Sequence, residues 1–483
     1  MQLYYLAIDI GASSGRHILG HVEKGKLVLE EIHRFDNKQL HRDGHDCWDM
    51  DNLWNGIVDG LKACKILGKI PATMGIDTWA VDYVLLDGDG KQIGDTVAYR
   101  DRRTIGMDEE MEGIIPAAEL YARTGIQKQI FNTVYQLTAL KREHPEHLKQ
   151  AKSLLMIPDY FNHRLTKVKK QEYTNATSTN LVNAAGKCWD MELIERLGLP
   201  ARLFGELSMP GTVVGELTEE IQELVGFNTT VVLPATHDTG SAFLAVPAKD
   251  DNAAYLSSGT WSLLGVENGE PITSEASRLQ NFTNEGGAWY RFRYLKNIMG
   301  LWMIQSIRRE LNGMSYVAGK ESKHATGRTY CFPDLIEEAK GAMDFPSIVD
   351  ANDDCFLAPN SMIDAIKDCC GKSSQPIPQT IGELMQCVYR SLSKCYNDTI
   401  ANLSQLTGRT YTSINIVGGG CQDMYLNQLT ANATGLPVYA GPVEGTAIGN
   451  LVVQMIAGGE FDGLQAARDA IRKSFDIKEI KPQ

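Results

Sequence analysis

The chain has 483 residues, of which 43% are hydrophobic and 22% are charged, and its formal net charge is −13. At roughly 150 residues per domain this length predicts more than one domain, and the composition is typical of a soluble globular protein. The negative charge argues against nucleic acid or an anionic membrane as a partner. The ten cysteines form no CxxC pair, which argues against structural zinc. Because no signal peptide or long apolar stretch is recognisable, we expect a cytoplasmic protein with mostly reduced thiols.

The chain opens with a pattern typical of a β-meander. Three strands are expected, at residues 4–8, 17–21 and 26–32. The first two strands are joined by a tight turn at residues 9–16. Apolar side chains at helical spacing predict a helix over residues 51–67. A strand-like run at residues 74–86 precedes the hairpin signal Asp87-Gly-Asp-Gly90, and residues 105–170 alternate helical stretches with short loops.

Residues 253–266 repeat the opening pattern of strand, tight turn and strand. Two such meanders predict a duplicated domain, with a break near the polar segment 247–251. We therefore expect two domains, residues 1–246 and 247–483. Further elements are expected in the second: a core helix at 379–406, a strand at 411–417 and helices at 422–434 and up to Met455. Since strands alternate with helices in both halves, the predicted fold class is α/β.

The stretch from Thr230 to Val246 is the first candidate for chemistry. A strand-like run leads into the small and polar residues 236–241, and an apolar, helix-like run follows. Ligands in α/β proteins gather beyond the carboxyl ends of strands. Asp238 in this stretch is either a helix N-cap or a catalytic carboxylate, and the local pattern leaves both interpretations open.

Two Ser/Gly turns and a glycine run are the other candidates. Residues 9–16 and 257–260 each follow a strand and offer hydroxyl and backbone N–H groups to phosphate oxygens; an ordinary hairpin turn is the alternative. Asp9 suits a divalent cation held through water, as magnesium prefers. The glycines at 418–420 would let a base or ribose lie on the backbone, or simply supply the positive φ of a strand-to-helix connection.

Other nucleotide-binding motifs are missing from the sequence. The pattern GxxxxGK[ST] fails because Ile366 stands where the first glycine is required before Gly371-Lys372-Ser373. No GxGxxG opens a helix after a strand, and the protein-kinase catalytic loop is incomplete. P-loop, Rossmann and protein-kinase interpretations are therefore disfavoured.

Taken together, these segments resemble the FGGY carbohydrate kinases. Residues 9–16 resemble that family's first phosphate loop, residues 256–262 its second, and residues 417–422 its adenosine loop. The other matching segments, which in the family line or support a ketose pocket or extend the match, are Gly75–Tyr83, Ala98–Thr104, Glu172–Thr177, Thr236–Thr239, Asn284–Gly287 and Lys296–Trp302. The match runs in chain order from about residue 5 to residue 455.

The resemblance implies two actin-like, ribonuclease-H-like lobes with an active-site cleft between them. It also implies ATP-dependent phosphorylation of L-rhamnulose at the 1-hydroxyl, with Mg²⁺ as cofactor. The expected partners are therefore a small ketose and ATP. The sequence sets no oligomeric state beyond a monomer or a small homo-oligomer.

The resemblance also assigns roles to individual residues. Asp238 matches the general base, and Asp9 would hold magnesium through water. Sugar contacts are implied for Ala80, His237, Asp238, Thr239 and Asn297. The aromatic residues Trp79 and Tyr99 are candidate walls of the sugar pocket, or else ordinary core aromatics. Nucleotide contacts are implied for Ala12, Ser13, Ser14, Gly15, Arg16, Thr260, Gln305 and Gly419.

Three alternatives stay open at this point. Ala80 departs from a pattern that allows glycine, and its methyl group would narrow the sugar pocket, so L-fuculose, L-xylulose or a related ketose is an alternative substrate. His237 is the alternative base, because the ordinary pKa of histidine lies near neutrality. An actin-like ATPase module without a sugar substrate would need the same phosphate turns but not the pocket segments.

Overall fold

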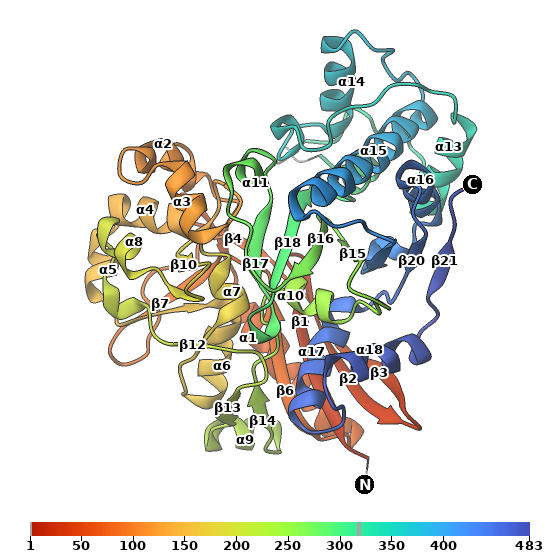
Figure 1. Cartoon of the computed structure of the whole chain (residues 1–483). Coiled ribbons are helices and arrows are strands. Elements are labelled where there is room, and N and C mark those ends of the chain that lie inside the picture. Colours follow the sequence, from red (N-terminus) through yellow and green to blue (C-terminus); the bar gives the residue numbers. More distant parts are fainter. Residues whose placement is uncertain (1, 316–319) are drawn as a thin grey trace. The chain divides into compact units, whose positions relative to one another are not determined.

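The computed structural model describes residues 2–315 and 320–483 (Figure 1). Packing divides the chain into two compact units, and each contains segments that are distant in sequence. Unit 1 consists of Met1–Pro247, Glu267–Leu295 and Glu444–Phe475, and unit 2 of Ala248–Val266, Lys296–Val443 and Asp476–Gln483. Among the described residues, no helix combines the length and the apolar character needed to cross a membrane.

Unit 1 is built on a six-stranded mixed sheet with the order β13-β14-β6-β1-β2-β3. Its strands are β1 (Tyr4–Ile10), β2 (Ser14–Glu23), β3 (Lys26–Asp36), β6 (Pro71–Thr78), β13 (Val213–Glu216) and β14 (Thr230–Val232). The first three form the predicted meander, with antiparallel pairing. The strand β6 pairs in parallel with both β1 and β14, so the carboxyl ends of these three strands meet at one edge.

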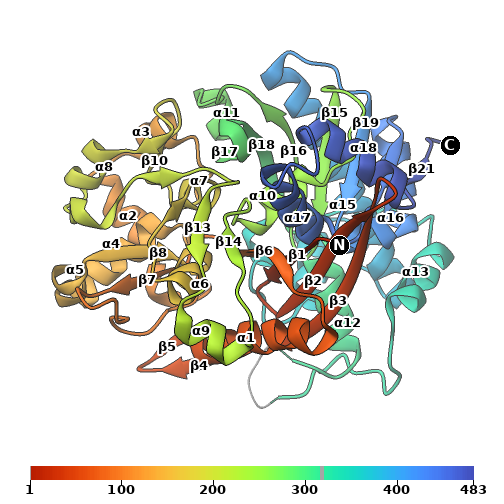
Figure 2. The ribbon, with the colours of Figure 1, turned by 90° about the horizontal axis from the view of Figure 1, so that it is seen from below.

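Helices cover both faces of this sheet (Figure 2). Side chains of β1 alternate between the faces: Leu6 and Ile8 pack with Leu53 of one helix layer, while Tyr5 packs with Leu451 of the other. A strand buried on both faces needs apolar residues at nearly every position, which explains the sequence of β1. The covering helices are α1 (Met50–Leu67) and α6 (Ile157–Thr166) on one face, and α17 (Gly445–Ala457) and α18 (Leu464–Ser474) on the other.

The segment from about residue 100 to residue 205 forms a second, mostly helical core within unit 1. Its helices include α2 (Met107–Glu112), α3 (Ala117–Thr124), α4 (Thr133–Glu143), α5 (Pro145–Gln150), α7 (Tyr173–Thr177) and α8 (Met191–Arg196). This confirms the predicted helical character. The turn expected at Asp87-Gly-Asp-Gly90 is present, with Asp87 N donating to Lys91 O at 2.9 Å, but the returning segment pairs only through an isolated bridge between Leu86 and Gln92. The strand β7 (Tyr83–Leu86) pairs along its length with β8 (Ser153–Met156).

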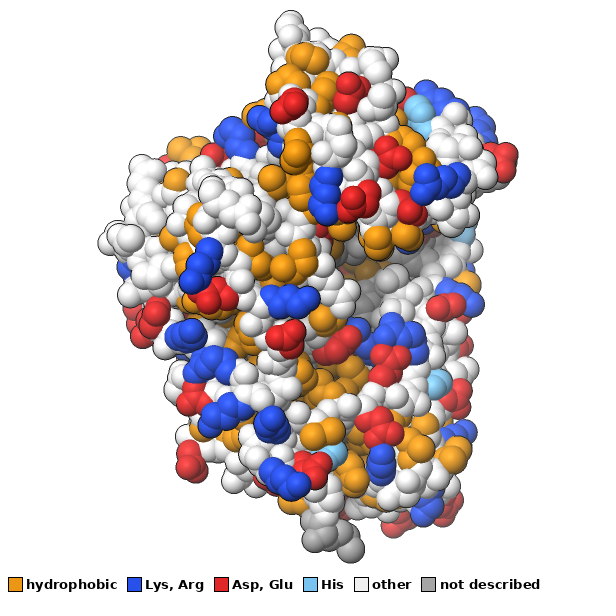
Figure 3. Space-filling view, turned by 90° about the vertical axis from the view of Figure 1, so that its right-hand side faces the viewer, with side chains coloured by type: hydrophobic (Ala, Val, Ile, Leu, Met, Phe, Trp, Pro, Cys, Tyr) orange, Lys and Arg blue, Asp and Glu red, His pale blue; other side chains and the backbone are white. Residues whose placement is uncertain are grey.

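Unit 2 repeats the strand arrangement expected from the sequence. Its ladder runs β16-β15-β19-β20-β21, with β15 parallel to β19 and antiparallel to β16. The bounds are β15 (Ala253–Ser258), β16 (Ser262–Asn268), β19 (Ser413–Val417), β20 (Val438–Ala440) and β21 (Lys478–Ile480). The long helix α15 (Ile381–Thr407) and the helix α16 (Met424–Thr434) confirm the helical predictions. Acidic and basic side chains are interspersed on the face shown in Figure 3.

Two buried thiols approach each other in unit 2. Cys370 lies on α14 (Met362–Lys372) and Cys387 on α15, and their Sγ atoms are 3.9 Å apart. Both cysteines are free. Burial raises the pKa of the Cys370 thiol, which keeps it protonated at neutral pH.

Candidate active site

Acidic residues gather at the carboxyl ends of the three parallel strands of unit 1. Asp9 and Asp77 are register partners on β1 and β6. After β14 the chain reaches His237, which bridges to Thr78 at the end of β6. The helix α10 (Asp238–Leu244) begins at the next residue. This edge of the sheet therefore collects Asp9, Asp77 and Asp238, at the place where α/β folds bind ligands.

Asp238 is the first residue of α10, and the N-cap position belongs to His237. The N-cap interpretation of Asp238 is therefore wrong by one position. Its Oδ1 accepts a hydrogen bond from Thr239 N at 2.6 Å, and 28% of the side chain is exposed. Burial and the nearby charge of Asp9 raise the pKa of Asp238 to about 7. A carboxylate with such a pKa suits proton transfer at neutral pH.

The turn between β1 and β2 presents its backbone at the same edge. Ala12 and Ser13 are exposed, and Gly11 N donates to Ser14 O at 2.9 Å. Asn37 braces the turn, because its N–H donates to Ser13 O and its side-chain amide to Gly11 O. Sequence reasoning missed Asn37, which lies outside the Ser/Gly turn.

Arg16 is held by two carboxylates. Its Nε and Nη2 donate to Asp9 Oδ2 at 3.0 and 2.8 Å, and its Nη1 lies 2.7 Å from Glu444 Oε2. We expected Arg16 to contact the nucleotide, and in this structure its guanidinium orients Asp9. Gly15 is required beside it, since a Cβ there would overlap the ring of Phe35.

The acidic edge suits a divalent cation. Burial and the charges of Asp9 and Asp238 raise the pKa of Asp77 well above its ordinary value, because Arg16 only partly compensates the negative charge at this edge. Asp77 Oδ1 is buried and accepts no hydrogen bond. Carboxylate oxygens are the ligands that Mg²⁺ prefers. The donor set therefore fits magnesium, with Asp9 as its expected holder.

Asp82 organises an aromatic cluster in unit 1. Its Oδ2 accepts hydrogen bonds from Trp48 Nε1 at 2.6 Å, Trp79 Nε1 at 2.9 Å and Tyr99 N at 3.1 Å. Gln136 Nε2 donates to the other oxygen at 3.0 Å. Burial raises the pKa of Asp82 to about 6, so the carboxylate is ionised at neutral pH. Asp82 and Trp48 were missed as individual site residues, because only the fold brings their distant segments together.

Ala80 sits next to a strained residue. Val81 has a φ of +68°, which is rare for a β-branched side chain. Its N–H donates to Ser178 Oγ at 3.2 Å, and Thr133 Oγ1 donates to its carbonyl oxygen at 2.6 Å. Such strain persists only where the surroundings hold it, and it is common at ligand sites. The backbone around Ala80 is thus fixed beside the Trp79 ring.

His237 and Thr239 belong to a network around Arg293, whose side chain is only 1% exposed. Arg293 Nη1 donates to Thr239 Oγ1 at 2.6 Å, and its Nη2 lies 3.0 Å from His237 Nδ1. The same Nη2 lies 3.0 Å from Glu285 Oε2. Arg293 and Glu285 are directly opposite each other in the hairpin of β17 (Thr283–Gly286) and β18 (Phe292–Ile298). Sequence reasoning quoted the segment of Glu285 without a role and missed Arg293.

The remaining predicted residues lie in unit 2. Thr260 Oγ1 donates to Gln305 Oε1 at 3.4 Å. Gly419 is exposed, and a Cβ there would meet open space. Gly420 is different, because a Cβ there would overlap Ser258 Oγ in the second Ser/Gly turn. In unit 2 the second Ser/Gly turn therefore packs directly against the glycine run at residues 418–420. Asn297 is a half-buried residue of β18.

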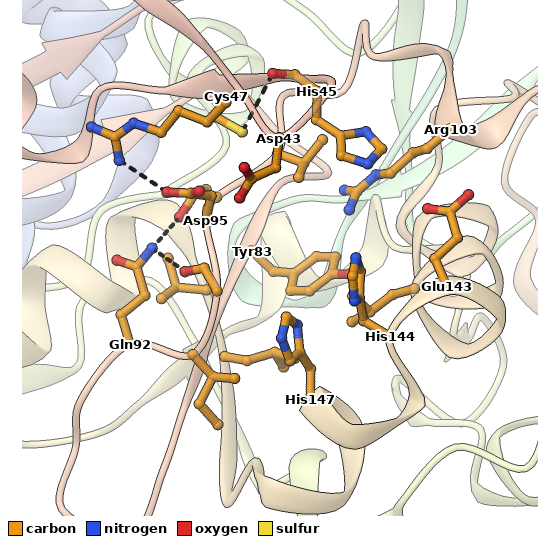
Figure 4. Close-up of a pocket in the computed structure, with 18 residues that line it drawn as sticks. Asp43, His45, Cys47, Tyr83, Gln92, Asp95, Arg103, Glu143, His144 and His147 are labelled. Atoms are coloured by element: carbon orange, nitrogen blue, oxygen red, sulfur yellow. Dashed lines mark hydrogen bonds and ion pairs between the residues drawn. The ribbon is translucent and has the colours of Figure 1, made fainter.

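A separate pocket of about 280 Å³ lies between residues 42–47, 83–103 and 140–147 of unit 1 (Figure 4). Tyr83, Arg103 and His144 are among the described residues that line it, and none of these was a predicted site residue. Arg103 Nη2 donates to Gln136 Oε1 at 2.7 Å, which links this pocket to the Asp82 cluster.

Beside this pocket, His144, Glu146 and His147 lie close enough together to share a metal ion. The two imidazole rings are stacked, with centroids 4.9 Å apart and 14° between their planes. Rings so nearly parallel do not direct their nitrogen lone pairs at one point, as a tetrahedral metal requires. We assign no metal to this cluster.

Comparison with known proteins identifies the family. The N-terminal domain of the FGGY family of carbohydrate kinases matches residues 4–245, and its C-terminal domain matches residues 254–458. A protein named rhamnulokinase from Halalkalibacterium halodurans is 50% identical over 475 residues, covering 98% of each chain. A rhamnulokinase from Bacillus subtilis is 42% identical and covers 100% of this chain and 96% of its own. The chain belongs to the FGGY family of carbohydrate kinases.

Solved structures agree on the fold. Gluconate kinase from Lactobacillus acidophilus superposes with a TM-score of 0.78 at 18% identity, covering 100% of this chain and 94% of that one. Plasmodium falciparum glycerol kinase with ADP gives a TM-score of 0.78 at 14% identity, covering 100% and 95%. The predicted α/β class with two domains is confirmed.

Proposed function

We propose that this protein is an ATP-dependent rhamnulokinase, which transfers the γ-phosphoryl group of ATP to the 1-hydroxyl of L-rhamnulose and yields L-rhamnulose 1-phosphate and ADP. The single observation that carries the chemistry is the Asp238 carboxylate, partly exposed and with a pKa raised to about 7. The sugar is inferred from the rhamnulokinases that are 41–50% identical over nearly the whole chain.

In this proposal Asp238 is the general base. A primary hydroxyl is a weak nucleophile, and a carboxylate within hydrogen-bond reach takes its proton as the new O–P bond forms. The bond between the γ-phosphorus and the β–γ bridging oxygen breaks, and ADP leaves. His237, Thr239, Ala80 and Asn297 contact the sugar, with Trp79 and Tyr99 as apolar walls.

We assign nucleotide contacts in each unit separately, as the family resemblance implies. Ala12, Ser13, Ser14 and Gly15 offer N–H and hydroxyl groups to the phosphates. Thr260, Gln305 and Gly419 hold the rest of the nucleotide. Magnesium, when bound near Asp9, would neutralise phosphate charge. Arg16 fixes the orientation of Asp9, and because 27% of its side chain is exposed we assign it to the phosphates as well.

His237 is disfavoured as the alternative base. Burial and the charge of Arg293 lower its pKa well below the ordinary value, so the ring is a poor proton acceptor at neutral pH. We propose the cytoplasm as the compartment, because the reaction consumes ATP.

The test is ADP release by the purified protein with ATP and L-rhamnulose, compared with ATP alone. We expect release that depends on the sugar and a phosphate ester at carbon 1, identified by phosphorus–proton NMR coupling. A panel with L-fuculose and L-xylulose ranks the ketoses by kcat/KM. Equal ADP release without sugar would favour the actin-like ATPase module. A higher kcat/KM for another ketose would make that ketose the substrate instead of L-rhamnulose.

A further inference from the structure

The Arg293 guanidinium decides which nitrogen of His237 carries the proton. Arginine has five N–H donors and no acceptor. Its Nη2 donates to His237 Nδ1 at 3.0 Å and forms an ion pair with Glu285 Oε2 at 3.0 Å, and that carboxylate oxygen is itself 3.4 Å from Nδ1. If Nδ1 carried a proton, two N–H groups would face each other at that distance. Because Nη2 lies nearer to Nδ1 than Glu285 Oε2 does and meets hydrogen-bond geometry, Nδ1 accepts from Arg293, and the single proton of the neutral ring lies on Nε2.

The protonated Nε2 faces the groups that surround the proposed base. It lies 3.1 Å from Thr239 Oγ1 and 3.5 Å from Asp238 Oδ1. Thr239 Oγ1 already accepts from Arg293 Nη1 at 2.6 Å, which leaves its own proton free to donate. The Nε2–H donates to Thr239 Oγ1, so the Thr239 hydroxyl is the donor left on the side of Asp238. Asp238 is the acceptor of this group.

Resting on the function proposed above, we infer that Arg293 is a positioning residue that fixes His237 as an Nε2–H donor and turns the Thr239 hydroxyl toward the ketose. The Thr239 hydroxyl then donates to an oxygen atom of the sugar, while the carboxylate of Asp238 receives the proton of the reacting hydroxyl. This arrangement also prevents His237 from acting as the base, because the nitrogen beside Asp238 is already protonated.

The β17–β18 hairpin holds the Arg293 side chain in one position. Arg293 and Glu285 are cross-strand partners, and Arg293 Nε donates to Gly286 O at 3.1 Å. The guanidinium also lies 5.9 Å from the centre of the Phe243 ring, on α10. A side chain on one strand moves to the other face when the register slips by one residue. The β17–β18 register therefore determines whether Arg293 can reach His237 and fix its tautomer.

The direct test is NMR of the ligand-free protein labelled with ¹⁵N-histidine, with the His237 signals identified by their loss in His237→Gln. We expect Nε2 to be protonated and Nδ1 to be unprotonated. A protonated Nδ1, or a mixture of the two tautomers, overturns the proposal. This readout needs no turnover, so it stands apart from the identity of the base and the substrate.

The kinetic test is Arg293→Lys, which keeps the charge but cannot donate to all these partners at once. We expect KM for L-rhamnulose to rise by about tenfold or more, the loss of a hydrogen bond to a charged group, with KM for ATP unchanged. Arg468→Lys is the matched control, because Arg468 is another buried arginine of unit 1 paired with a glutamate, Glu267. An unchanged KM for the ketose in folded Arg293→Lys overturns the proposal. If Arg293→Lys does not fold, Glu285→Gln replaces it, with a smaller rise expected and the same contrary outcome.

Discussion

Asp9 and Asp77 lie directly opposite each other on the parallel strands β1 and β6, with Asp238 close enough to affect the pKa of Asp77. Like charges gathered in a buried place raise one another's pKa values. Arg16 compensates the charge of Asp9 only in part, because it also forms an ion pair with Glu444. Burial first, and then the charge of Asp9 at this edge, give Asp238 the raised pKa on which its proposed role depends.

The pH dependence of the reaction should report this carboxylate. Asp238 must be ionised to accept a proton, and its pKa is about 7. We therefore expect kcat/KM for the ketose, at saturating MgATP, to fall about tenfold per pH unit below that pKa. The His237→Gln variant should keep the same inflection, because His237 is already neutral in this range. Loss of the inflection in that variant would assign it to His237.

Removing the charge of Asp238 should strongly slow turnover and stabilise the protein. We expect Asp238→Asn to bind ATP and the ketose but to lose kcat by about 100-fold or more. The folded state holds the proton of Asp238 more tightly than the unfolded chain, so stability is lost as pH rises toward about 7. Asp238→Asn should therefore melt roughly 2–4 °C higher than wild type at pH 8, with little difference near pH 4. A variant that melts lower at pH 8 would contradict the raised pKa.

The aromatic cluster should depend on the acceptor at its centre. In Asp82→Asn an NH₂ group replaces one carboxylate oxygen. This group cannot accept a hydrogen bond from the indole N–H groups or from Gln136. We expect a loss of about 1–3 kcal/mol in the free energy of unfolding and a higher KM for the ketose, since Trp79 and Tyr99 lose their common anchor. Urea unfolding and steady-state kinetics measure both.

Asp190→Asn is the control for that variant. Asp190 is a buried carboxylate of unit 1 that accepts from Arg123, Asn183 and the backbone of α8. It should lower stability without changing KM for the ketose. If both variants leave KM unchanged, the aromatic cluster is ordinary core.

Two neighbouring glycines should separate packing from nucleotide binding. A methyl group at Gly419 meets open space, whereas one at Gly420 overlaps Ser258 Oγ. We expect Gly419→Ala to keep the wild-type melting temperature but to raise KM for ATP several-fold, because the methyl group enters the space proposed for the nucleotide. Gly420→Ala should lower the melting temperature. An unchanged KM for ATP in Gly419→Ala would remove Gly419 from the nucleotide site.

The sequence alone predicted most of the regular elements. Hydrophobic periodicity located the meander at the N-terminus and the long helix now seen as α15, because a strand or helix that buries one face must repeat apolar residues at its own period. The motifs around residues 9–16 and Asp238 also predicted the family, because the residues of each motif are neighbours in the sequence and can be recognised without the fold.

The tertiary structure alone decided what surrounds those motifs. Glu444 reaches Arg16, and the segment Glu444–Phe475 belongs to unit 1 although it lies near the end of the chain. Arg293 reaches His237 across 56 positions in the sequence, and Asp82 gathers indoles from two separate segments. Local patterns identify a side chain, but its protonation state depends on burial and on partners brought by chain topology. The sequence therefore pointed to Asp238, and the fold set its pKa and determined what His237 beside it can do.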